Sequence, residues 1–385
     1  LPEDSLFHVE RDLTLLALGA GLFLLLSRLV LGVDVLSRAI IAPIDNPLVD
    51  LGAQERVAHA IALLGRYLAL CLFPWQLSAD YGLGAAGLVE GLAAPPSLLW
   101  LALCGTLVAV TVVGVARGSV RLAFAGVWFF GTFAVTANLL FPIGVAFADR
   151  LAYVPSVAVC ALAAWLLAER TSGVVRTAAA GGVLASFAAL TLSYGAVWRD
   201  DATLVAYEMR TSPSAKMQAA YGKVLLDRGD HEGAREHFLA ALDAYPRHMM
   251  AAYGLAVVEL REGRPEEARA WLEKAITLDP GHGPSLVLLG RMRFARGEID
   301  DAARLFVRAL NSDSRSFDAK LGVLAALLAR GNVAQAAALR DELMALAPQQ
   351  PELRALSAEL DRKLDRARGG SARDDDVALA GPGGA

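Results

Sequence analysis

Long apolar stretches fill the first half of the chain, and they decide which environment it can fold in. Six of them are long and apolar enough to cross the roughly 30 Å hydrocarbon core of a bilayer. The expected spans are residues 13–33, 57–73, 97–115, 122–140, 151–168 and 174–197. The second is short and carries His59 and Arg66, so a tilted or re-entrant segment, with five crossings in all, is an alternative. The chain is therefore predicted to be an integral membrane protein.

Basic residues in the short loops give the expected orientation of these spans. Two turns carry paired arginines, as is typical of cytoplasmic loops: Arg117 with Arg121, and Arg170 with Arg176. The loops at 74–96 and 141–150 hold one basic residue between them and are predicted to face outward. The last span then exits on the outer side. Residues from Arg199 onward are expected in the periplasm of a bacterial inner-membrane protein, or in the lumen of the endoplasmic reticulum if the source is eukaryotic.

Composition excludes several classes of function. Hydrophobic residues make up 55% of the chain and charged residues 20%, and the formal net charge is −4. An acidic chain without a basic arm or face is poorly suited to the phosphate backbone of nucleic acids. Cys71, Cys104 and Cys160 lie singly in apolar runs, so neither a disulfide framework nor a protein-bound zinc ion is predicted.

The second half repeats with a fixed period of 34 residues. The recurring residues are Gly229, Gly263, Gly297 and Gly331, then Ala234, Ala268, Ala302 and Ala336, then Pro246, Pro280 and Pro348. This is the period of the tetratricopeptide repeat, in which a small residue lets two helices approach and proline ends the second helix. Phe238, Leu272 and Phe306 fill the predicted core of three units. Arg340 takes this place in the fourth unit, which is expected near the end of the stack.

The predicted architecture is all-α, with a polytopic helical membrane domain followed by a tetratricopeptide-repeat solenoid. The expected parts are the membrane domain at 1–198, a juxtamembrane link at 199–212, four repeats at 213–350, a capping helix at 351–368 and a disordered tail at 369–385. The chain opens without Met and without a signal-peptide pattern, so natural sequence is expected upstream of Leu1.

Two sequence blocks in the membrane half resemble those of a known enzyme family. The first is IDNPLVD followed by GRYLALCLFPWQLSADYG, and the second is ANLLFPIGVAFADRLAYVPSV. With the repeats, they resemble the transmembrane and tetratricopeptide repeat-containing O-mannosyltransferases and their bacterial relatives, which are C-type glycosyltransferases. The resemblance implies transfer of a sugar from a polyprenyl-phosphate carrier to Ser or Thr of proteins. It also implies a catalytic acidic residue in a first outer loop. No segment here corresponds to that loop, so this residue is expected upstream of residue 1.

Three residues are candidates for binding the carrier phosphate. Arg66 lies inside an apolar run, where an unpaired charge is costly, so it should face a cavity or an anion. Pairing of Arg66 with a carboxylate or with helix carbonyls is an alternative of equal weight. Arg150 and Tyr153 stand where an outer loop enters the fifth span, and they offer a guanidinium fork and a hydroxyl at headgroup depth. The alternative for this pair is an ordinary interfacial anchor.

Two carboxylates are candidates for orienting the acceptor hydroxyl or a divalent cation. Asp149 directly precedes the fifth span, and Asp80 lies in the outer segment QLSADYG. Helix capping is the alternative for that segment and is slightly favoured, because Ser78 and Asp80 are both good N-cap residues. The segment IDNPL predicts a turn on any account.

The inner groove of the repeats is the candidate peptide site. Positions that usually line such a groove hold Lys223, Tyr253, Arg261, Arg291 and Phe294. This mixed surface suits an extended acceptor or partner peptide, but it lacks the paired Lys and Asn that grip a C-terminal carboxylate. A scaffold surface without a fixed ligand is the alternative.

Two functions of different classes remain. The favoured one is the C-terminal part of a membrane glycosyltransferase that uses a polyprenyl-phosphate-linked sugar as donor, with membrane lipid and acceptor proteins as partners. The other is a non-enzymatic membrane anchor that displays a repeat scaffold for envelope or secretory assembly. An acidic pair after an upstream transmembrane helix would favour the enzyme, and a natural start near Leu1 would favour the scaffold.

Overall fold

The computed structural model describes residues 41–74, 77–79, 81–83, 95–134, 136–138 and 142–379. Within these ranges the chain forms α-helices and short 3-10 helices and no strand, which confirms the predicted all-α class. The chain divides into two compact units, Leu1–Gln218 and Ala219–Ala385. The expected first span, at 13–33, lies outside the described residues.

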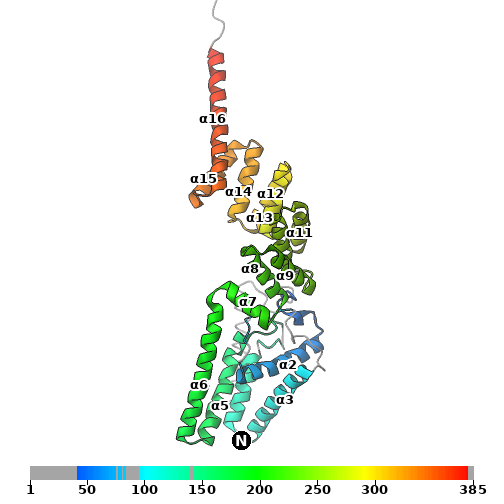
Figure 1. Ribbon diagram of the computed structural model, residues 1–385, viewed down its shortest axis with the longest axis vertical. Helices are drawn as coiled ribbons and strands as arrows, with labels where there is room; N and C mark the ends of the chain where they lie inside the picture. Colours follow the sequence, from blue (N-terminus) through cyan, green and yellow to red (C-terminus); the bar gives the residue numbers. More distant parts are fainter. Residues whose placement is uncertain are drawn as a thin grey trace, which may run out of the picture. The chain divides into compact units, whose positions relative to one another are not determined.

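The first unit holds the apolar helices. They are α2 (Ala53–Leu72), α3 (Pro95–Ala116), α4 (Val120–Phe133), α5 (Tyr153–Arg170) and α6 (Gly173–Gly195), with the 3-10 helices η2 (Pro47–Asp50), η3 (Asp149–Ala152) and η4 (Ala196–Arg199). In the described part of the chain, three segments are long and apolar enough to cross a membrane: Ser97–Ala116, Asp149–Arg170 and Gly173–Arg199. In Figure 1, α5 and α6 are joined at one end by a tight turn, at residues 171–172.

The two turns with paired arginines lie at the same end of these helices. Arg121, at the start of α4, pairs with Glu169 at the end of α5. The Arg121 guanidinium also lies 3.8 Å from the centre of the Trp165 ring. The two turns therefore share one side, and the compartment that this side faces stays a prediction.

Two stretches of the first unit depart from the expected elements. Helix α4 ends at Phe133, whereas the expected span runs to residue 140. The chain turns away at Asn138, whose φ of 59° lies in the left-handed region that asparagine tolerates. The expected link at 199–212 contains helix α7 (Asp201–Thr211), whose N-terminus is capped by Asp200 through a 2.8 Å bond from the Thr203 amide. Helix α7 belongs to the first unit.

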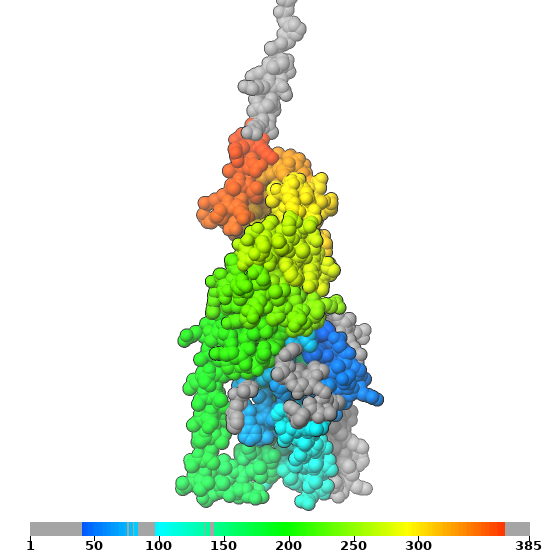
Figure 2. Space-filling view, turned by 45° about the vertical axis from the view of Figure 1, so that its right-hand side comes forward, coloured from blue at the N-terminus to red at the C-terminus, as the bar shows by residue number. Residues whose placement is uncertain are grey.

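The repeats form helical hairpins (Figure 1), and the colours in Figure 2 show that they follow one another in chain order. Their helices are α8 (Ala215–Asp227), α9 (His231–Ala244), α10 (Met249–Arg261), α11 (Pro265–Leu278), α12 (Gly283–Ala295), α13 (Ile299–Ser312), α14 (Phe317–Ala329) and α15 (Val333–Leu346). The four glycines with the 34-residue step all have φ between 75° and 84°, and the four alanines are fully buried. The turns need glycine because this backbone conformation disfavours a side chain. The predicted register is therefore the observed one.

Helix α16 (Pro351–Leu379) covers the last repeat. Its Leu353 and Leu360 are buried against the last repeat. Arg340, which replaces the core residue of the fourth unit, pairs with Asp361 of α16 at 2.7 Å. An arginine fits there because the stack ends and its guanidinium reaches the surface. The helix continues to Leu379, although the tail was expected to begin at residue 369.

Phenylalanine in the repeat core is matched by two glycines. A Cβ added at Gly254 would lie 2.3 Å from Cζ of Phe238, and one added at Gly222 would lie 3.0 Å from the same ring. Phe306 is enclosed in the same way by Gly290 and Gly322.

The unit between them has a smaller core residue and larger neighbours. Leu272 occupies the position of the phenylalanines, and the sites that correspond to the two glycines hold Ala256 and Leu288. A larger core residue is therefore paired with smaller neighbours, and a smaller core residue with larger neighbours, so that each unit stays closely packed.

This compensation predicts that Gly254→Ala destabilises the first repeats by about 1–3 kcal/mol, because the Phe238 ring is also confined by Gly222 and cannot move away. Adding Phe238→Leu to the same chain should recover most of the loss. Amide hydrogen exchange in α9 and α10 would measure both effects. An equal loss in the single and double variants would refute the compensation.

A histidine at the start of α12 makes the stability of the repeats depend on pH. His282 lies 2.7 Å from Ser285 through Nδ1 and Oγ, and burial lowers its pKa below the ordinary 6.5, although nearby Asp279 opposes this. As pH falls below about 6.5, the unfolded chain therefore takes up a proton at this site before the folded chain does. Stability is complete above this pH and declines below it.

We expect hydrogen exchange in α12 to speed up between pH 6.5 and 5.5, after correction for the intrinsic rate. His282→Ser should remove the part of this change that comes from the imidazole. Serine is the matched substitute, because Ser214 and Ser316 occupy the corresponding positions of other units. An unchanged pH dependence in this variant would exclude His282 as its source.

Candidate functional site

Two buried asparagines join the sequence blocks that carry the family resemblance. Asn46, before η2, donates through Nδ2 to Asn138 Oδ1 at 2.8 Å and to the Ile143 carbonyl at 2.7 Å. Its Oδ1 accepts from the Leu48 amide at 3.0 Å. Asn138 accepts from the Ile143 amide at 2.9 Å, and its Nδ2 donates to the carbonyls of Val145 (3.1 Å) and Ala146 (3.2 Å). Both asparagines are at most 1% exposed. This pair fixes the loop that leads into Phe147 and Asp149.

Helix α2 holds the same loop from another direction. The Ala148 amide donates to the Tyr67 hydroxyl at 2.9 Å. The Tyr67 ring packs against Phe133 at 4.6 Å and Phe147 at 4.1 Å between ring centres. Tyr67 is 1% exposed, so the position of Phe147 is set by the core of the unit.

Residues at the start of η3 bind the segment 77–79, which follows α2. The Ser78 amide donates to Asp149 Oδ2 at 2.5 Å, and Arg150 Nη1 donates to the Ala79 carbonyl at 3.3 Å. The predicted residues Asp149 and Arg150 therefore hold backbone of the outer loop.

Helix α7 binds the segment 77–79 through two residues, Tyr207 and Glu208, that no sequence motif marks. Glu208 is 1% exposed and accepts from the Ala79 amide at 2.9 Å and from the Ser78 hydroxyl. Tyr207 donates its hydroxyl to the Leu77 carbonyl at 3.0 Å. Nothing in the local sequence distinguishes Glu208 from the other acidic residues that follow the last span.

A pocket of about 660 Å³ opens beside this loop. Its lining comes from the end of α2, the start of α3 and two aromatic residues: Arg66, Ala69, Leu70, Leu72, Phe73, Tyr81, Leu99, Trp100, Leu103 and Phe147. The two helices approach closely where Gly65 faces Trp100, since a Cβ at Gly65 would lie 1.8 Å from the Trp100 carbonyl oxygen. Most of the lining is aliphatic or aromatic, and among the described residues Arg66 is its one charged member.

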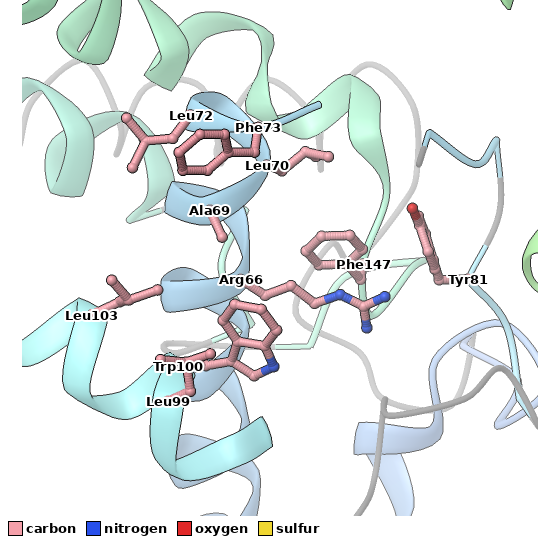
Figure 3. A pocket seen from close by; sticks show the side chains of 10 residues that line it. All are labelled: Arg66, Ala69, Leu70, Leu72, Phe73, Tyr81, Leu99, Trp100, Leu103 and Phe147. Carbon is pink, nitrogen blue, oxygen red and sulfur yellow. The ribbon is translucent and has the colours of Figure 1, made fainter. Parts of the chain in front are cut away.

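The Arg66 guanidinium extends from α2 towards the space between Phe147 and Tyr81 (Figure 3). Its central carbon lies 4.7 Å from the centre of the Phe147 ring and 4.9 Å from that of Tyr81. Within the described residues it makes no ion pair and no hydrogen bond. The aromatic faces stabilise the cation but leave its N–H groups available for an anion.

Tyr81 closes one side of the pocket as a neutral phenol. It is 6% exposed and packs edge-on against Phe147 at 4.8 Å. Burial raises the pKa of Tyr81, and the negative charge of Asp149, to which its hydroxyl bonds, raises it further.

The structure brings some of the predicted site residues together and leaves others apart. Arg66 and Asp149 meet around Tyr81, and Arg150 lies at the edge of the same loop with its side chain exposed. Tyr153 is 80% exposed and does not line the pocket. Asp80 lies outside the described residues.

The described part of the chain contains no cluster of side chains suited to bind a metal ion. No three His, Cys, Asp or Glu side chains gather there in a way that could hold a metal ion. Because Asp80 is one of the two predicted cation ligands, the role of a divalent cation stays a prediction.

The predicted groove residues of the first two repeats make local contacts. Lys223 pairs with Asp227 at 2.9 Å, and Arg261 Nη1 donates to the Leu226 carbonyl at 3.2 Å. The Tyr253 ring is half-buried.

Arg291 and Phe294 lie together in a hollow of about 180 Å³ between α12, α14 and α16. Arg291 pairs with Asp318 at 3.0 Å and with Glu352 at 3.3 Å. These carboxylates satisfy the guanidinium, so an incoming peptide carboxylate would have to compete with them.

A tetratricopeptide-repeat family model matches residues 220–282 and 287–351. The second unit therefore contains tetratricopeptide repeats over these residues. A tetratricopeptide repeat protein from Parabacteroides merdae has a similar solved structure, with 18% identity, a TM-score of 0.36, and coverage of 52% of this chain and 80% of that one.

Two curated relatives extend the comparison. The protein O-mannosyl-transferase TMTC1 of Mus musculus is 28% identical over 207 residues, which are 51% of this chain and 22% of the mouse protein. The CTR9 homolog of Arabidopsis thaliana is 31% identical over 106 residues, 27% of this chain and 10% of that protein. The chain thus spans about a fifth or less of these relatives. Because 51% of the chain is more than residues 219–385, the match to the mouse protein includes part of the first unit.

Proposed function

We propose that the chain is the C-terminal part of a membrane glycosyltransferase, similar to the O-mannosyltransferases, that binds a polyprenyl-phosphate-linked sugar and transfers the sugar to Ser or Thr of proteins. The observation that carries this proposal is the Arg66 guanidinium, which stands beside an apolar pocket without a carboxylate partner among the described residues. The partial likeness to the mouse O-mannosyl-transferase beyond the repeats supports the same class.

The chemistry of the pocket suits an amphiphilic phosphate. Its aliphatic and aromatic walls would cover isoprene units, and the guanidinium would bind phosphate oxygens through charge-assisted hydrogen bonds. A carboxylate within bonding distance of Arg66 would have competed with the phosphate. Asp149 instead bonds to the Ser78 amide and the Tyr81 hydroxyl.

The other predicted residues have subsidiary roles in the proposal. Arg150 is exposed beside the loop and would bind the sugar or another oxygen of the same phosphate. Tyr153 is also exposed and would contact the headgroup region. The repeats would bind the acceptor or a partner protein through the groove around Arg291 and Phe294.

Sugar transfer by the purified full-length protein in detergent tests this function. The donor is a radiolabelled mannosyl polyprenyl phosphate, and the acceptor is a peptide rich in Ser and Thr. We expect label in the peptide, and none when the acceptor hydroxyls are replaced by alanine. No transfer, together with no binding of a polyprenyl phosphate, would favour the repeat scaffold without enzymatic activity.

A further inference from the structure

Glu208 is a buried carboxylate in α7, which follows the last apolar helix and precedes the repeats in the chain. It is 1% exposed, although every other residue of the helix that carries it, α7, is partly or fully exposed. Burying a carboxylate is costly unless strong donors satisfy it. The Ala79 amide and the Ser78 hydroxyl, 129 and 130 residues away in the chain, are these donors. The contact therefore ties α7 to the loop that follows α2.

The same three-residue segment is held from two sides. Glu208 and Tyr207 bind it from α7, and Asp149 and Arg150 bind it from η3. Together they engage the Leu77 carbonyl, both polar hydrogens of Ser78, and the amide and carbonyl of Ala79. A loop with its backbone groups bonded in this way has little freedom to shift.

Tyr81 follows this segment closely in the chain and forms one wall of the pocket. Its ring lies 4.9 Å from the Arg66 guanidinium. Two residues further on, the Leu83 carbonyl accepts from the Ala215 amide at 2.9 Å. The segment that contains α7 and the start of α8 thus contacts the loop on both sides of Tyr81.

We infer that Glu208 is a positioning residue for the proposed carrier site, because it fixes the segment 77–79 and thereby holds Tyr81 against Arg66. This inference rests on the proposed function for its role in carrier binding. Glu208 does not line the pocket, so it acts through the loop and not on the carrier itself. The stretch between the last span and the repeats is then part of the site and more than a tether.

Amide exchange in the full chain tests the structural half of the inference without any carrier. Glu208→Ala should speed exchange of the Ser78 and Ala79 amides at least tenfold, with no change in α14. Asp201→Ala is the matched control, because Asp201 is an exposed carboxylate of the same helix. Unchanged exchange at Ser78 and Ala79 in Glu208→Ala would overturn the inference.

Binding of a fluorescent polyprenyl phosphate to the same variants tests the positioning role. Glu208→Ala should weaken binding about five- to tenfold. Glu208→Gln should recover most of the affinity and of the exchange protection, because glutamine has the same length, can accept from the Ala79 amide and can bond to the Ser78 hydroxyl. Loss of affinity in Glu208→Gln as large as in Glu208→Ala, with protection restored, would mean that the charge acts directly.

Two further results keep the test decisive. If Glu208→Ala fails to fold, Tyr207→Phe removes one bond between α7 and the Leu77 carbonyl and should give a smaller rise in exchange of the same segment. If the unmodified chain binds no polyprenyl phosphate, the proposed function fails. The exchange measurements then still decide whether Glu208 holds the loop.

Discussion

Replacing Asn138 with alanine is expected to destabilise the first unit by roughly 3–5 kcal/mol, because it breaks a buried network of hydrogen bonds. The Asn46 amide, the Ile143 amide and the carbonyls of Val145 and Ala146 would lose their partner in a region closed to water. Alanine also disfavours the left-handed backbone at this residue, where φ is 59°.

Thiol labelling during heating measures this loss in the first unit alone. All three cysteines lie in that unit, and Cys104 is 6% exposed, so its reaction with a fluorescent maleimide reports opening of the core. Asn138→Gly separates the two causes, since glycine accepts the backbone conformation but supplies no amide. We expect glycine to recover about 1 kcal/mol of the loss. Full recovery by glycine would show that the backbone, and not the hydrogen bonds, accounts for the effect.

The repeat unit was predictable because its determinants are local and recur. Each turn needs a glycine with positive φ, and each close contact needs an alanine, so both leave a 34-residue pattern that the structure reproduces. The departure at Arg340 was predictable as well, because a core position that holds a charge must lie at an end of the stack. Its partner, Asp361, was not, because the surface of a capping helix offers several carboxylates.

The candidate site was predictable only in part. Arg66 stands out in sequence because a charge inside an apolar run requires an explanation. Its aromatic neighbours come from two loops: Phe147 from the loop that Asn46 and Asn138 hold, and Tyr81 from the loop that contains segment 77–79. Hydrogen bonds between loops leave no periodic signal in a sequence, so these contacts could not be inferred.

Glu208 shows the same limit more clearly. It lies a few residues after Asp200 and Asp201, which cap or begin α7 and are exposed. Glu208 meets Ser78 and Ala79 only because it lies on the face of α7 that packs against this loop. Residues 199–212 are predicted from the sequence only as a link, and nothing in their spacing indicates contact with a loop 130 residues earlier.

Arg66→Ala is expected to weaken binding of a polyprenyl phosphate by about one to two orders of magnitude. A charge-assisted hydrogen bond to a phosphate contributes about 1.5–3 kcal/mol, and each 1.4 kcal/mol is a factor of about ten in Kd. Folding should be retained, because the guanidinium makes no ion pair within the described residues and loses only its contacts with Tyr81 and Phe147. Arg66→Lys should recover part of the affinity, since lysine keeps the charge but not the planar fork.

The measurement compares a fluorescent polyprenyl phosphate with the same polyprenol lacking the phosphate, in detergent micelles. Arg121→Ala is the matched control, because Arg121 also lies on an aromatic ring but pairs with Glu169 and does not line this pocket. If Arg66 binds the phosphate, Arg66→Ala weakens binding of the phosphate and leaves that of the alcohol nearly unchanged. Equal weakening of both ligands would mean that the side chain shapes the apolar pocket, and the phosphate would then have to be bound elsewhere.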